Sequence, residues 1–171
     1  VPAVFIVLGP PVNPYLPERQ FIVTAFADLM DVIFETGIKM SKKHLIVVRG
    51  HDGLDEISVS VPTRVLEYRD GKTYDYEIRP QDFGIEAVPF DAVSADNQDV
   101  CLAVAQDILA GRPGSQHYKL VAVNAAFIYT KFVENIPLPD AFQKMEQLIF
   151  NGVLGQVLEQ YKATYGEAVP A

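Results

Sequence analysis

Two adjacent acids, Asp55 and Glu56, close a polar loop that follows the apolar, β-branched run 45–48. Such a run is typical of a strand buried on both faces. Neighbouring side chains on a regular strand point to opposite faces, but Gly50 and Gly53 free the loop, so the two carboxylates can converge. Convergent oxygens are the ligands that Mg²⁺ requires. The alternative interpretation is a solvated acidic turn, because charged residues usually lie exposed.

The spacing of the three histidines predicts no zinc site. His44, His51 and His117 lie far apart and lack the spacing of zinc ligands. His51 stands in the same loop as Asp55, so it is a candidate for orienting a substrate, although a loop histidine is commonly just solvated. Ser58 lacks the G-x-S-x-G context of a hydrolase nucleophile, so we expect no catalytic triad.

Composition narrows the class of protein. The chain has 171 residues, enough for one domain, and we predict a single domain over residues 1–171. A net charge of −8 argues against nucleic acid or an anionic membrane as a partner. Cys101 is the single cysteine, which fits a reducing, cytoplasmic compartment, and we expect it in a helix as inert core. The first residues lack the features of a signal peptide and look like a strand entered in mid-course.

The first part of the sequence predicts the strands that position the acidic loop. Residues 3–8 and 20–24 are expected to be strands, and a proline-rich rigid loop separates them. A helix is expected from Asp28, a candidate cap, to Gly37, with an apolar side formed by Leu29, Val32 and Ile33. Strand 45–48 follows, and this βαβ order implies a parallel pair with a right-handed crossover. Ligands of open α/β sheets bind beyond the carboxyl ends of such strands.

In the second part of the sequence the spacing of the apolar residues changes. Residues 64–68 and 72–78 predict a hairpin around Asp70-Gly71, covered on one face, and residues 80–96 are loop-like. A helix is predicted over 97–110, whereas the apolar run from Leu120 does not distinguish strand from helix. Asn124 either caps the following helix or holds the acidic loop, and we favour the cap. A long last helix is predicted from Pro139, with an apolar stripe formed by Phe142, Met145, Ile149, Leu154, Leu158 and Tyr161.

Four segments together resemble the carboxyl-terminal half of anthranilate phosphoribosyltransferase, in order and in approximate spacing. They are L-G-P-P-V-N-P at 8–14, V-V-R-G-H-D-G-L-D-E-I-S at 47–58, D-F-G at 82–84 and V-N-A-A at 123–126. The third and fourth segments would mean little alone. The resemblance implies an α/β fold with a central, mostly parallel sheet flanked by helices, a β-hairpin insertion, and no amino-terminal helical domain within these residues.

The resemblance also implies a reaction and its site. Anthranilate attacks C1 of phosphoribosyl pyrophosphate, pyrophosphate leaves, and Mg²⁺ neutralises and orients that leaving group. In the family the acidic pair is the magnesium site, which maps onto Asp55 and Glu56. Gly9 and Pro10 correspond to a wall of the anthranilate channel, or else form only a tight turn. The family's phosphate-binding loops, its helical domain and an arginine that binds anthranilate all precede the position of Val1, so we expect the isolated chain to be inactive.

Departures from the family pattern leave other functions open. Ile6 stands for the usual Asn, Pro11 for Leu, Arg49 for His and Val61 for a common Gly. One alternative is a non-enzymatic module, or one that works only when its missing half is supplied. Another is a paralogue that acts on a nucleobase, as pyrimidine nucleoside phosphorylases do. A homodimer would form through the amino-terminal region that these residues lack.

Overall fold

The structure is a computed structural model that describes residues 9–95 and 97–166. The chain folds into two compact units, Val1–Ala87 and Val88–Ala171. The strand predicted over residues 3–8 lies outside the described residues.

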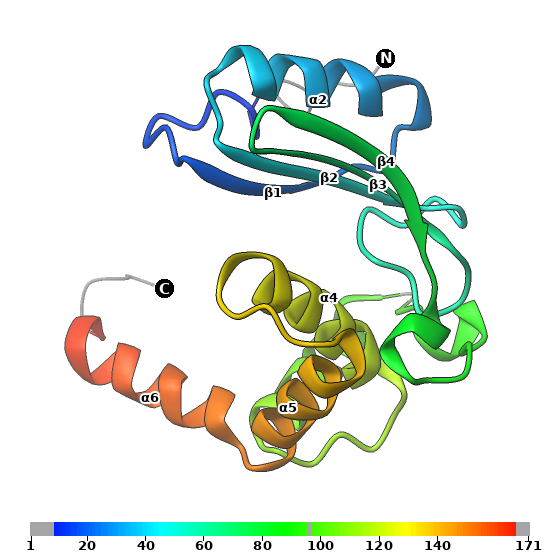
Figure 1. The fold of residues 1–171 in the computed structure, drawn as a ribbon. Coiled ribbons are helices and arrows are strands. Elements are labelled where there is room, and N and C mark those ends of the chain that lie inside the picture. Colours follow the sequence, from blue (N-terminus) through cyan, green and yellow to red (C-terminus); the bar gives the residue numbers. More distant parts are fainter. Residues whose placement is uncertain (1–8, 96, 167–171) are drawn as a thin grey trace. The chain divides into compact units, whose positions relative to one another are not determined.

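The first unit contains a four-stranded sheet with a helix lying along one face (Figure 1). Its elements are β1 (Arg19–Val23), the 3-10 turn η1 (Ala27–Leu29), α2 (Met30–Lys39), β2 (His44–Gly50), β3 (Thr63–Arg69), β4 (Lys72–Ile78) and the 3-10 turn η2 (Pro80–Phe83). The second unit is helical, with the 3-10 turn η3 (Phe90–Ala92), α3 (Gln98–Leu109), α4 (His117–Phe132), α5 (Leu138–Phe150) and α6 (Val153–Tyr165). The predicted α/β class is confirmed.

The sheet is mixed, and its order is β1-β2-β3-β4. β1 and β2 pair in parallel, as the predicted βαβ order requires, whereas β2–β3 and β3–β4 pair antiparallel. The prediction of a mostly parallel sheet is therefore wrong in this detail. The physical reason is that the hairpin joins the sheet directly beside β2 instead of forming a separate ribbon.

Strand β2 is the buried centre of the first unit. Residues 45–48 have no exposed surface, because the strand is hydrogen-bonded on both sides and covered on both faces. On one face Leu45 and Val47 pack with Met30, Ile33 and Phe34 of α2. This packing confirms the strand that the β-branched run predicted.

The ends and the buried face of α2 differ from the prediction. Asp28 lies in η1, and the residue that precedes α2, Leu29, makes no capping bond through its side chain. Val32 is exposed, and the helix continues past Gly37 to Lys39. A Cβ at Gly37 would lie 2.5 Å from Leu45 Cδ2, so this glycine serves the close approach of helix and strand and does not end the helix.

The hairpin turn follows the sequence signal. Asp70 and Gly71 both have positive φ, 51° and 75°, which is the backbone of a type I′ turn. Behind the turn, β3 carries the buried carboxylate Glu67, which accepts a hydrogen bond from the Tyr76 hydroxyl at 2.6 Å and pairs with His44 Nε2 at 2.9 Å. Burial and this carboxylate raise the pKa of Tyr76. The network joins β2, β3 and β4.

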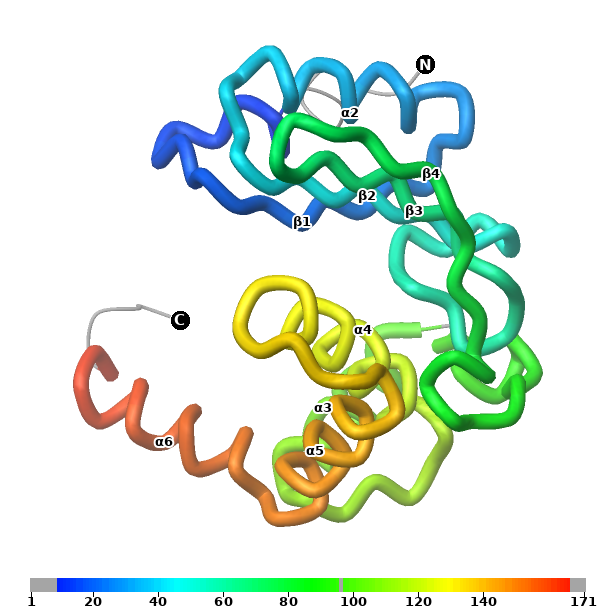
Figure 2. Tube along the Cα trace, viewed as in Figure 1, coloured from blue at the N-terminus to red at the C-terminus, as the bar shows by residue number. Residues whose placement is uncertain are grey.

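The helices of the second unit confirm one boundary and correct another. Asn97 Oδ1 accepts from the Val100 amide at 3.0 Å, so α3 begins where predicted. The predicted single last helix is in fact two helices, α5 and α6, separated by Gly152 with a φ of 67°, and Figure 2 shows the break in the trace. The backbone of Gly111 packs closely against this break. A Cβ on Gly111 would lie 2.9 Å from Gly152 N and from Phe150 O.

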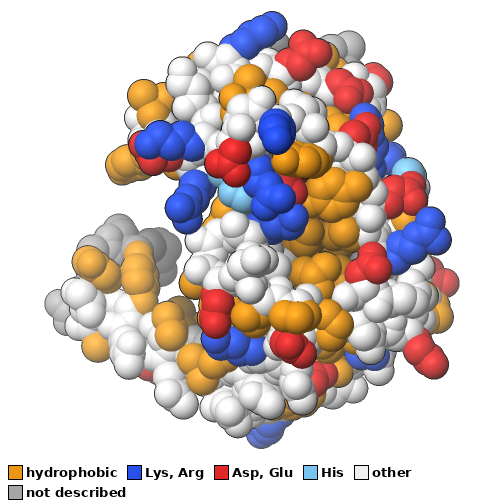
Figure 3. Space-filling view, viewed as in Figure 1, with side chains coloured by type: hydrophobic (Ala, Val, Ile, Leu, Met, Phe, Trp, Pro, Cys, Tyr) orange, Lys and Arg blue, Asp and Glu red, His pale blue; other side chains and the backbone are white. Residues whose placement is uncertain are grey.

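The undecided segment after Leu120 is helical and belongs to α4. Asn124 lies inside this helix, where its Nδ2 donates to the Leu120 carbonyl at 2.9 Å, so the predicted capping role is wrong. No helix among the described residues has the length and apolar character needed to cross a membrane. On the face drawn in Figure 3, acidic and basic side chains are interspersed and do not gather into a patch of one sign.

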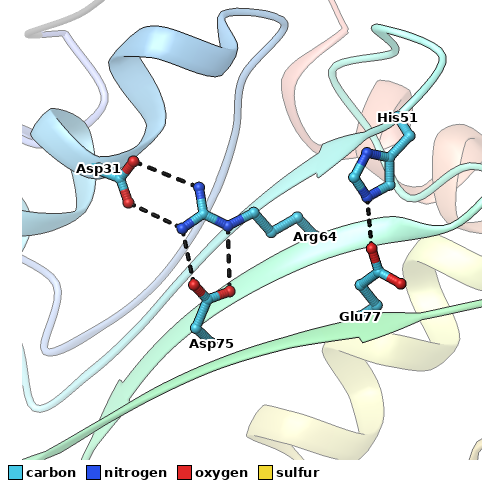
Figure 4. Close-up of polar contacts among 5 residues, drawn as sticks. All are labelled: Asp31, His51, Arg64, Asp75 and Glu77. Atoms are coloured by element: carbon cyan, nitrogen blue, oxygen red, sulfur yellow. Dashed lines mark hydrogen bonds and ion pairs between the residues drawn. The ribbon is translucent and has the colours of Figure 1, made fainter.

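Arg64 ties α2 to the hairpin (Figure 4). Its Nη2 donates to Asp31 Oδ1 at 3.1 Å and to Asp75 Oδ2 at 2.8 Å, and its Nε donates to Asp75 Oδ1 at 3.2 Å. These bonds lower the pKa of Asp75 and raise that of Arg64. The guanidinium thereby holds two carboxylates that come from different elements.

We predict that Asp75→Asn destabilises the protein at neutral pH but not at strongly acidic pH. The folded pKa of Asp75 is depressed, so its stabilisation is fully present above the ordinary value of 3.8 and is lost as the pH falls through the folded pKa. Asp75 is more than half exposed, so we expect a loss below about 1 kcal/mol in the free energy of unfolding. Urea denaturation at several pH values measures it. Asp107→Asn, on an exposed acid of α3, is the control, and an equal effect of Asp75→Asn at all pH values would contradict the prediction.

Candidate functional site

The candidate site is the loop that leaves the carboxyl end of β2, residues 50–62. Asp55 is exposed and Glu56 is half-buried, while Ile57 and Val59 behind them are buried. These two apolar residues shortly after the acids therefore anchor the loop in the core. Burial, and then the neighbouring Asp55 carboxylate, raise the pKa of Glu56. The charge of Asp55 thus adds to burial in disfavouring the ionised form of Glu56.

The two glycines of this loop act in different ways. Gly53 has a φ of 90°, a conformation that side chains rarely adopt, so it makes the turn as the sequence predicted. Gly50 provides space, because a Cβ on it would lie 2.4 Å from Asp52 Oδ1 and 3.3 Å from Ser58 Cβ. Any side chain at residue 50 would displace the carboxylate that organises the loop.

Asp52 and Ser58 hold the loop together, and the sequence reasoning did not single out Asp52. Asp52 Oδ1 accepts from the Leu54 amide at 3.1 Å, and its Oδ2 accepts from the Ser58 hydroxyl at 2.7 Å. The buried Ser58 Oγ in turn accepts from the amides of Ser60 and Val61 at 2.9 and 3.1 Å. The available signal was an acid followed by glycine in a turn, since such side chains bond to backbone amides two residues on.

The other predicted residues lie elsewhere. Gly9 is exposed and Pro10 half-buried, and the Pro10 carbonyl accepts from the Gln20 side chain near the amino end of β1. The acidic loop leaves the opposite, carboxyl end of the parallel strand β2. The substrate-binding role of Gly9 and Pro10 stays a prediction. Arg49, which replaces a histidine of the family pattern, donates through Nε to the Ala25 carbonyl at 3.0 Å.

The described residues contain no cluster of three or more histidine, cysteine or acidic side chains that could hold a metal ion. The acidic pair still fits Mg²⁺, which is commonly held by one or two carboxylates and completes its shell with water and substrate phosphates. Burial and then the charge of Asp55 disfavour ionised Glu56, and a bound divalent cation would offset both effects. Donor type and charge are therefore compatible with Mg²⁺.

A concavity lies within the helical unit. It is an apolar hollow of about 470 Å³ between α3, α4 and the segment before them, with Cys101 and His117 among its lining residues. Cys101 is exposed, so the expectation that it is core is wrong. His117 has both ring nitrogens in use, Nδ1 with Ser115 Oγ at 2.8 Å and Nε2 with the Ser94 carbonyl at 3.1 Å. This arrangement fixes a structural histidine and offers no free base.

Comparison with known proteins assigns the chain to a family. The profile described as "Glycosyl transferase family, a/b domain" matches residues 1–153. The chain belongs to this glycosyl transferase family. The match includes the acidic loop and all described strands.

Two relatives of this chain are both named anthranilate phosphoribosyltransferase. The chain is 32% identical over 145 residues to an anthranilate phosphoribosyltransferase of Mannheimia succiniciproducens, which covers 85% of this chain and 42% of that protein. It is 34% identical over 129 residues to that of Vibrio parahaemolyticus, covering 75% of this chain and 39% of the relative. The chain thus spans less than half the length of these relatives. The resemblance inferred from the sequence motifs is confirmed.

Solved structures of the same family show the fold. Anthranilate phosphoribosyltransferase from Saccharomyces cerevisiae in complex with 4-fluoroanthranilate aligns with a TM-score of 0.82 at 21% identity, covering 97% of this chain and 48% of that one. The Thermus thermophilus enzyme aligns with a TM-score of 0.78 at 24% identity, covering 95% and 48%. At these identities the likeness establishes the fold alone.

We predict that Ser58→Ala lowers the free energy of unfolding by about 1–3 kcal/mol, because two backbone amides and Asp52 lose a buried partner. The matched control is Ser60→Ala, since Ser60 Oγ is buried without a hydrogen-bond partner among the described residues. Its removal should cost much less. Urea denaturation of both variants measures the difference, and equal losses would contradict the role of Ser58.

Proposed function

We propose that this chain is the carboxyl-terminal part of an anthranilate phosphoribosyltransferase. It would take part in transferring phosphoribose from phosphoribosyl pyrophosphate to anthranilate, a step of tryptophan biosynthesis. The observation that carries this proposal is the Asp55–Glu56 pair at the carboxyl end of β2, in a chain similar to enzymes of that name. A yeast enzyme of this name, solved in complex with PRPP and Mg, shares the fold with a TM-score of 0.79 at 20% identity.

The proposed reaction forms a bond from the amine nitrogen to C1 of the sugar and breaks the bond from C1 to the pyrophosphate oxygen. The pyrophosphate leaves with the bonding electron pair, and the amine loses a proton. Asp55 and Glu56 would hold Mg²⁺, which when bound supplies positive charge against the leaving diphosphate. The contribution of this chain's other residues is geometric. Asp52 and Ser58 keep the loop closed, and buried Ile57 fixes the position of Glu56.

The proposal extends to the organisation of the chain. One family profile runs through both compact units, which supports a single α/β domain over residues 1–171. Gly9 and Pro10 would form a wall of the anthranilate site. Homodimerisation would use the part of the relatives that this chain does not match, and the single cysteine fits a cytoplasmic location.

We predict that Mg²⁺ raises the thermal unfolding midpoint of the chain in the presence of pyrophosphate, and that the double variant Asp55→Asn, Glu56→Gln abolishes this rise. A ligand that binds only the folded state stabilises it, so losing both carboxylates should remove the Mg²⁺-dependent part. Differential scanning fluorimetry with and without Mg²⁺ measures it. Asp70→Asn, on an acid in the hairpin turn that tolerates asparagine, is the control. An unchanged Mg²⁺ effect in the double variant would contradict the site.

We predict little or no turnover by the 171-residue chain with anthranilate and phosphoribosyl pyrophosphate. No G-x-G-x-x-G or G-x-x-x-x-G-K-[ST] motif occurs in it, and such motifs supply backbone amides that bind a diphosphate. A steady-state assay tests this, and turnover of about 1 s⁻¹ or more would refute it. A thermal-shift panel with anthranilate, uracil and thymine tests the substrate class, since stabilisation by a pyrimidine alone would favour the nucleobase paralogue.

A further inference from the structure

His51 fastens the beginning of the acidic loop to a strand that is distant in the sequence. Its Nε2 lies 2.9 Å from Glu77 Oε1, and Glu77 stands near the end of β4 (Figure 4). The backbone amide of His51 also donates to the Pro62 carbonyl at 3.0 Å. At His51 the main chain therefore bonds to the far end of the loop, and the side chain bonds to β4.

The His51–Glu77 pair is poorly placed to stabilise the whole fold. The two side chains are 46% and 43% exposed, and ion pairs or hydrogen bonds at such sites contribute little to global stability. Its effect is concentrated on the segment that it closes, because exposed loops open locally at a much lower cost than core strands. Gly53 follows His51 two residues later, and a Cβ on it would meet no atom within 4 Å, so no side chain packs at this position of the turn.

We propose that His51 and Glu77 are positioning residues for the acidic loop. Their contact keeps residues 51–54 against β4, and this fixes the approach of Asp55 and Glu56 to a divalent cation on a diphosphate substrate. The inference rests on the proposed function, and it assigns to these two residues a role that acts through the loop. The internal bonds of Asp52 shape the loop, whereas the His51–Glu77 contact sets where the shaped loop lies.

The first test is amide hydrogen exchange of the 171-residue chain without metal. Glu77→Ala should speed exchange of the amides of His51, Gly53 and Leu54 by about two- to five-fold, the range that an exposed pair provides, while exchange in β2 and the urea midpoint stay unchanged. Glu77→Gln keeps an acceptor for His51 and should retain most of the protection. Arg79→Ala is the matched control, because it removes the other partner of the same carboxylate, 3.2 Å away.

The second test is an Mg²⁺ titration in the presence of pyrophosphate. Glu77→Ala and His51→Ala should each weaken the apparent Mg²⁺ affinity by about two- to five-fold, whereas Arg79→Ala should not. Unchanged loop exchange and unchanged affinity in Glu77→Ala would overturn the positioning role while leaving the proposed function intact. Absence of any Mg²⁺ effect in the unaltered chain would overturn the metal site itself. If Glu77→Ala lowered the free energy of global unfolding as much as it lowered the free energy of loop opening, the pair would have only a structural role. That result would also overturn the positioning role.

Discussion

The pairing of β2 with a strand on each side is the constraint on which the candidate site depends. Residues 45–48 have no exposed surface, so β2 cannot shift or turn without breaking hydrogen bonds on both sides. Its carboxyl end is consequently a fixed point, and the loop that leaves it begins in a known place and direction. Asp52 and Ser58 then satisfy the polar groups of that loop internally, so Asp55 and Glu56 are presented by a defined backbone.

Local chemistry explains the parts of the fold that the sequence predicted. The β-branched run at 45–48 has one favourable environment, a strand covered on both faces. Asp70-Gly71 has one favourable turn, since both residues accept a positive φ. Asn97 is followed by an apolar helical pattern, and it caps the helix that begins there. In each case residues adjacent in the sequence decided the structure, so a sequence pattern was sufficient.

Contacts between distant residues explain the errors. The sequence of residues 63–78 does not indicate that their hairpin pairs with β2. The sheet was therefore predicted to be mostly parallel, whereas the hairpin makes it mixed. Asp52 organises the site through Ser58, a partner six residues away that only the folded loop brings near. The break at Gly152 was different, because Asn151-Gly152 is a recognisable turn signal that the continuous apolar stripe outweighed.

Strand β4 ends the sheet of four described strands, and its composition bears on association between copies of the chain. An open edge offers unpaired backbone groups to any other extended segment. β4 carries Lys72, Asp75 and Glu77, with the acids alternating along one face beside Arg64. Charged side chains on an edge strand oppose its pairing with the same strand of another copy, because pairing would remove water from them. This edge therefore discourages the cross-strand polymerisation to which flat, apolar edges are prone.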